Sequence, residues 1–166
     1  MVRRLAAGRN SPEGRGNVVV IRSLVVAALV AYLFVLLAIT LAYQSPRPFT
    51  VEERLMLTPF RSIARDVRQG GDAFQINIVG NVVVFTPLGA AFVALGGRRA
   101  RLRRAALAGF LLSASIEALQ FQTARRFTDV DDVILNTMGT IVGFLAADAL
   151  RRVLGAWSGR EDDRLE

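Results

Sequence analysis

Four long apolar runs constrain this chain more than any other feature of its sequence. They cover residues 24–43, 76–95, 105–121 and 133–154. At about 1.5 Å per residue, a helix over the first run is roughly 30 Å long, which matches the hydrocarbon core of a bilayer. Hydrophobic residues make up 52% of the chain, more than in most soluble proteins. The sequence therefore predicts an all-α polytopic membrane protein, a bundle of four transmembrane helices.

The first apolar run fits either a retained membrane anchor or a signal peptide. It is longer than the apolar core of a usual signal peptide, and no small-x-small cleavage site closes it. We therefore expect an anchor, with the membrane domain over residues 24–154. The basic lead before it, residues 1–23, is expected to be cytoplasmic and poorly ordered, because Pro12, Gly14 and Gly16 interrupt regular structure.

Arginine clusters indicate how the helices are oriented. The segment from Arg98 to Arg104, between the second and third runs, contains five arginines and no acid. Arg151 and Arg152 end the fourth run, and a polar tail follows over residues 155–166. Because positively charged loops stay in the cytoplasm, we predict a multi-pass protein of the bacterial cell membrane with both termini on the cytoplasmic side. The net charge of +7 then reflects orientation and contact with membrane lipids, and no nucleic-acid partner is expected.

The residue types present limit the chemistry of any site. The chain has no Cys and no His, which excludes disulfides, thiol and imidazole catalysis and the usual zinc sites. Any catalysis must therefore use carboxylates, amides, hydroxyls or arginine. No cofactor and no metal site is predicted.

The longest polar connection, residues 44–75, has two interpretations. Its apolar residues recur near helical spacing, which suggests a short amphipathic helix on the membrane surface, interrupted at Thr58-Pro59-Phe60. The residues of that apolar face are Val51, Leu55, Ile63 and Val67. An ordinary solvated loop explains the same pattern.

Polar side chains gather where three of the spans approach one hinge. In the predicted topology Asn81 lies near the outer end of the second span, and Glu117 and Gln120 lie near the outer end of the third. Asn136 begins the fourth span. The hinge between the last two spans adds Arg126, Asp129 and Asp132. Polar groups at membrane depth are costly and usually functional, so the sequence predicts a polar pocket at the depth of the outer leaflet.

Several roles stay open for these residues. Glu117 suits a general acid or base, or the anchor of a pocket for a lipid-linked headgroup. It also suits a buried hydrogen-bond network in which Glu117 and Gln120 bind Asn81, Asn136 or Arg126. The hinge acids Asp129, Asp131 and Asp132 fit a divalent cation site or helix caps. Capping of the fourth helix, by Asp129 and Asp132, is favoured because these acids precede its start and no calcium-loop spacing is present.

Small residues mark the expected contacts between helices. Gly139 and Gly143 are four residues apart on the fourth span, a spacing typical of closely packed transmembrane helices. Gly89 lies in the second span, two residues after Pro87, which is expected to kink that helix near mid-depth.

Three successive motifs resemble those of the VanZ-like family, over roughly residues 28 to 150. They are Asn81-Val-Val-Val-Phe-Thr-Pro87-Leu-Gly89, Ile116-Glu117-Ala-Leu-Gln120, and Arg126-Phe-Thr-Asp129-Val-Asp131-Asp132-Val-Ile-Leu-Asn136-Thr-Met-Gly139 with Gly143. The family's loop motif Asn-Leu-x-Pro-Phe is present only in part, since Met56 occupies the Asn position. The resemblance implies a small bacterial multi-pass membrane protein, and the family's namesake confers resistance to the glycopeptide teicoplanin.

We therefore expect a protein that binds or modulates a cell-envelope lipid or lipoglycopeptide at the outer leaflet, and the resemblance implies a role in glycopeptide resistance. A membrane enzyme that uses Glu117 on a lipid-linked substrate, and an assembly factor without a ligand, are the alternatives. Only the enzyme needs a reactive group next to a carboxylate, and the non-enzymatic interpretation is favoured.

Overall fold

Helices make up most of the chain in a computed structural model, which describes residues 12–42, 50, 55–96, 100–122 and 128–162. The long helices are α2 (Pro12–Ala42), α6 (Gly80–Gly96), α7 (Leu102–Gln122) and α8 (Val130–Asp162). The short elements are β1 (Leu55–Met56), α4 (Arg61–Gln69), α5 (Gly71–Ala73), the π-helix η1 (Phe74–Val79) and β2 (Thr128–Asp129). Within the described residues, four segments are long and apolar enough to cross a membrane: Gly16–Thr40, Gly71–Gly96, Leu102–Gln122 and Val130–Gly155. The prediction of an all-α polytopic bundle is confirmed.

The first and last helices extend beyond the predicted apolar runs. α2 already begins at Pro12 and runs through Gly14 and Gly16, so the expectation that these residues interrupt structure is wrong. Proline fits the first turn of a helix because the amide it lacks would have no partner there. α8 continues to Asp162, through most of the predicted polar tail. Apolar content thus located the membrane-crossing parts and not the helix ends.

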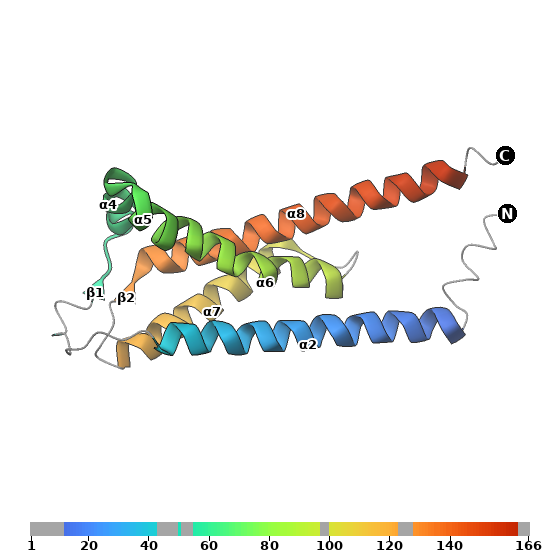
Figure 1. Ribbon diagram of the computed structural model, residues 1–166, viewed down its shortest axis with the longest axis horizontal. Helices are drawn as coiled ribbons and strands as arrows, with labels where there is room; N and C mark the ends of the chain where they lie inside the picture. The colour runs from blue at the N-terminus through green and yellow to red at the C-terminus, as the bar shows by residue number, and fades with distance from the viewer. Residues whose placement is uncertain (1–11, 43–49, 51–54, 97–99, 123–127, 163–166) are drawn as a thin grey trace.

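The most extensive packing joins α6 to α8, and α7 packs against α8 beside them. α2 lies along the bundle and mainly contacts α6. The hydroxyl of Tyr32 in α2 donates a 2.7 Å hydrogen bond to the carbonyl oxygen of Val84 in α6. Leu36 of α2 is buried against Phe85, Leu88 and Ile116. Figure 1 shows the start of α2 and the end of α8 at one end of the molecule, and β1, β2 and α4 at the other.

Glycines bring the backbones of α6 and α8 into direct contact. A Cβ added to Gly143 would lie 1.9 Å from the Thr86 carbonyl oxygen, and one added to Gly139 would lie 2.2 Å from that of Val82. From the opposite helix, a Cβ on Gly89 would lie 1.9 Å from the Thr140 carbonyl oxygen. These distances leave no room for a side chain. α6 continues as a helix through Pro87, and the kink expected there stays a prediction.

The connection before the second span contains a helix that carries part of the predicted apolar face. α4 begins directly after Phe60, whereas Leu55 belongs to β1 and Val51 lies outside the described residues. The side of α4 that faces the bundle carries Ser62 and Asp66, both buried, and Val67 is 54% exposed. Of the predicted apolar face, α4 carries Ile63 and Val67, and the contact of these two residues with the membrane surface stays a prediction.

Cysteine labelling tests the orientation in the membrane. The native chain has no Cys, so single substitutions at Gly97, Gln69 and Thr123 give unique reporters. With an impermeant thiol reagent on intact cells, we expect labelling of Gln69→Cys and Thr123→Cys and none of Gly97→Cys. The physical reason is the retention of the arginine-rich segment in the cytoplasm. The reverse pattern would contradict the predicted orientation.

Candidate functional site

The polar residues of interest lie at the end of the bundle where the two strands pair. β1 and β2 form a short parallel bridge, with Leu55 opposite Thr128 and Met56 opposite Asp129. This bridge places the segment before α4 beside the start of α8 (Figure 1). Residues far apart in the sequence therefore surround one small region.

Asp131 is the buried acid that ties α4 to α8. Its side chain is 1% exposed, and its carboxylate accepts hydrogen bonds from the backbone amides of Phe60 (2.5 Å), Ser62 (2.8 Å) and Ile63 (3.0 Å). α4 has no side-chain cap of its own, so Asp131 satisfies amides at its N-terminus from another helix. Phe60 adopts a left-handed conformation with φ of 65°, which costs about 1–2 kcal/mol in a residue with a side chain. The contacts with Asp131 offset that cost.

Asp66 forms a second buried link, between α4 and the π-helix. Its side chain accepts hydrogen bonds from Arg65 Nε at 2.8 Å and from Asn77 Nδ2 at 2.9 Å. Burial raises the pKa of the Asp66 carboxyl, but the hydrogen bonds from Arg65 and Asn77 outweigh it and hold this pKa below its ordinary value. Asp66 is therefore ionised at neutral pH.

The two predicted helix caps differ in what they do. Asp129 Oδ1 accepts a 2.9 Å hydrogen bond from the Asp131 amide, so Asp129 caps α8. Asp132 lies in the first turn of α8, where an acid favours the helix N-terminus, and accepts a 2.8 Å hydrogen bond from Asn81 Nδ2 of α6. Among the described residues no three acids lie close enough to hold a metal ion, so the divalent cation alternative has no support there.

The remaining predicted residues make the following contacts within the described part of the chain. Glu117 Oε2 accepts a 3.1 Å hydrogen bond from the Asp129 amide, and Gln120 Nε2 donates to the Thr40 carbonyl oxygen at 3.4 Å. Asn136 Nδ2 donates to Ser113 Oγ at 2.8 Å. Its own Oδ1 is buried and has no partner among the described residues. Arg126 lies outside the described residues.

A polar cavity of about 200 Å³ lies between α4, η1, β2 and the start of α8. Its polar lining comes from four elements: Ser62, Arg65 and Asp66 of α4, Asn77 of η1, Asp129 of β2, and Asp131 and Asp132 of α8. A second hollow, of about 470 Å³, lies beside it and is lined by Glu117 and mostly apolar residues. Asp129 lines both. The first hollow suits a polar group, and the second suits an apolar one.

Residues 24–151 match the VanZ/LLP1 family. The chain belongs to this family. The resemblance of its motifs is thereby confirmed, and the matched range includes every residue that lines the two hollows. Searches of curated proteins and of solved structures return no match.

Within this VanZ/LLP1 chain, sequence reasoning missed part of the polar cavity. Arg65, Asp66 and Asn77 were not among the predicted site residues, and Asp131 was considered only as a cap or cation ligand. Ser62 and Asp66 are four residues apart and so share one face of α4, a signal that the apolar pattern of this segment obscured. The π-helix around Asn77 had no sequence signal that we recognised.

Proposed function

We propose that this VanZ/LLP1 protein binds the polar headgroup of a lipid-linked envelope component or lipoglycopeptide at the outer leaflet of a bacterial cell membrane. The observation that carries the proposal is the polar cavity at one end of the four-helix bundle. It lies where apolar spans give way to α4 and to the capped start of α8. A headgroup at the membrane surface would meet the cavity at that depth.

The chemistry of the lining favours a headgroup that carries hydroxyl or ammonium groups. A carboxylate offers about four lone-pair positions, and Asp66 uses only two in its contacts with Arg65 and Asn77. The other positions are suited to accept from a ligand. Arg65 uses its Nε toward Asp66 and has further N–H donors for a ligand oxygen. Because carboxylates outnumber the one described cation in the lining, an anionic headgroup would be repelled.

Binding without catalysis is favoured by the state of Glu117. Among the described residues that line the apolar hollow, Glu117 and Asp129 are the ionisable ones. Glu117 Oε2 accepts a hydrogen bond from the Asp129 amide. This hydrogen bond to the backbone explains a buried carboxylate at the start of α8 without any catalytic role. Glu117 thus has a positioning role between the two hollows.

Antibiotic tolerance tests this function in cells. Expression in a susceptible Gram-positive host should raise tolerance to teicoplanin more than to vancomycin, which lacks the acyl tail that anchors teicoplanin to a membrane. Glu117→Ala and Asp132→Ala should lose the protection at matched abundance in the membrane. Asp148→Ala is the control, because Asp148 pairs with Arg151 and Arg152 away from the cavity. Equal tolerance in all four strains would contradict a role for the cavity.

A further inference from the structure

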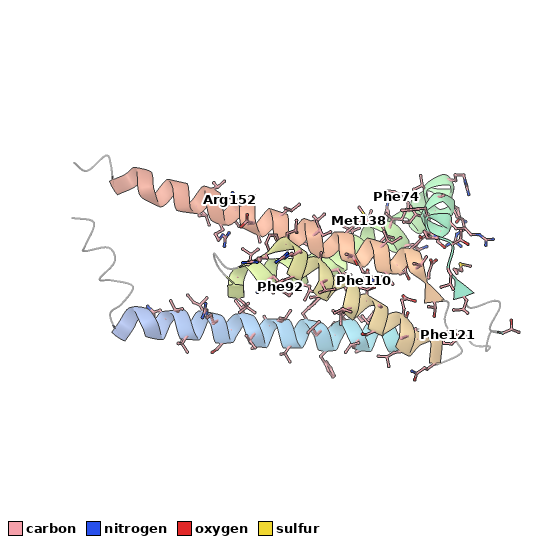
Figure 2. All side chains as sticks on the ribbon, turned by 180° about the vertical axis from the view of Figure 1, so that it is seen from behind. Phe74, Phe92, Phe110, Phe121, Met138 and Arg152 are labelled. Atoms are coloured by element: carbon pink, nitrogen blue, oxygen red, sulfur yellow. The ribbon has the colours of Figure 1, made fainter. Side chains whose placement is uncertain are left out.

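The apolar hollow beside the cavity is a groove between the end of α7 and the start of α8. Its lining includes Ala114 and Ala118, one helical turn apart on α7, and the apolar residues Phe121, Val130 and Val133. Its volume of about 470 Å³ lies within the range of roughly 300–1,000 Å³ that is usual for ligand pockets. Figure 2 shows Phe121 at the same end of the molecule as Phe74, which begins the π-helix. The groove therefore opens next to the polar cavity.

The position of the groove indicates what fills it. Both helices that form it are long and apolar enough to cross a membrane, and Ala118 in its lining is exposed. The groove would therefore be open to the hydrocarbon of a bilayer around these helices. Asp129 borders it at one end and lines the polar cavity too, and Glu117 holds the Asp129 backbone in that place. A single amphiphile can thus place its headgroup in the cavity and its tail in the groove without a gap between them.

We infer that the groove holds one acyl chain of the bound amphiphile, and that Ala114 and Ala118 set the width available to it. The inference rests on the proposed function, because binding of the headgroup in the cavity brings the acyl chain to the groove. A side chain larger than alanine at either position fills the space that the acyl chain would occupy. Such a substitution should therefore abolish binding of the acyl chain in the groove and leave the polar cavity intact.

Photo-crosslinking of the full-length chain in lipid nanodiscs tests the inference. The probe is phosphatidylethanolamine with a diazirine at mid-chain, whose ammonium group donates hydrogen bonds to carboxylates. We expect cross-links to concentrate on Phe121, Val130 and Val133 rather than on exposed positions such as Val83 or Leu111. Ala118→Phe should reduce the groove cross-links several-fold, whereas Leu111→Phe, on the same helix outside the groove, should leave them unchanged.

Cross-links spread evenly over the exposed apolar residues, or unchanged by Ala118→Phe, would overturn the inference. Binding of deacylated teicoplanin to the native protein tests the headgroup site alone, and so distinguishes failure of this inference from failure of the proposed function. That probe has a headgroup and no tail, so Ala118→Phe should leave its binding unchanged. Loss of its binding in Ala118→Phe would also overturn the inference, because the groove would then serve the headgroup. Circular dichroism of each variant in the same nanodiscs checks that the helices persist.

Discussion

Gly143→Ala should destabilise the protein by about 3 kcal/mol, the upper end of the usual cost of overpacking. The added Cβ would lie 1.9 Å from the Thr86 carbonyl oxygen, a backbone atom that cannot rotate away. α6 and α8 would have to separate along their whole contact, which is the most extensive in the bundle. Equilibrium unfolding in mixed detergent micelles measures the loss.

Gly155→Ala is the matched control for this prediction. It lies on the same helix, and a Cβ added there meets nothing within 4 Å. We expect its free energy of unfolding to stay within about 0.5 kcal/mol of the native value, as for most surface changes. Gly89→Ala, which meets α8 from the opposite side, should behave like Gly143→Ala. Equal stability of Gly143→Ala and Gly155→Ala would show that the two backbones do not touch.

Asp131→Ala should release α4 from the bundle. The change leaves the amides of Phe60, Ser62 and Ile63 without their acceptor, and each buried unsatisfied amide costs about 1–3 kcal/mol. No side chain of the N-cap residue replaces it, and the left-handed Phe60 would lose the contact that offsets its strain. Hydrogen exchange at Ser62 and Ile63 should accelerate by at least about 100-fold, which corresponds to 2.7 kcal/mol at 1.36 kcal/mol per tenfold.

Two further variants make this result specific. Asp131→Asn keeps one acceptor oxygen and should accelerate exchange less than Asp131→Ala does. Asp148→Ala removes an acid from the same helix far from α4 and should leave exchange at Ser62 unchanged. If Asp131→Ala left both amides as protected as in the native chain, Asp131 would not be what holds α4 in place.

The parts of the fold that depend on apolar content could be predicted from the sequence. Lipid selects long apolar helices, so the four runs located the four membrane-crossing segments. The spacing of Gly139 and Gly143 predicted close helix packing, because glycines on one helix face leave room for the backbone of a neighbouring helix. Helix ends could not be found in this way. α2 and α8 extend into polar sequence, where neither apolar content nor Pro12 marks a stop.

The polar site could be predicted only in part, because its contacts depend on tertiary structure. Asn81, Glu117, Asp129 and Asp132 were found from their depth in the predicted topology. Their partners were not, since the pairing of Asn81 with Asp132 requires the register of α6 against α8. Asp131 looked like one of three equivalent hinge acids, and only the approach of α4 distinguishes it. Asp66 was missed because its segment was assigned an apolar face.

The central claim, that the polar cavity binds a headgroup, is tested most directly by the affinity of the full-length protein for teicoplanin in nanodiscs. Asp132→Asn removes a charge from the cavity lining but keeps an oxygen that can accept from Asn81. We expect it to weaken binding at least tenfold, or about 1.4 kcal/mol. Asp148→Asn, far from the cavity on the same helix, should bind like the native protein. The same affinity for Asp132→Asn and the native protein would contradict the claim.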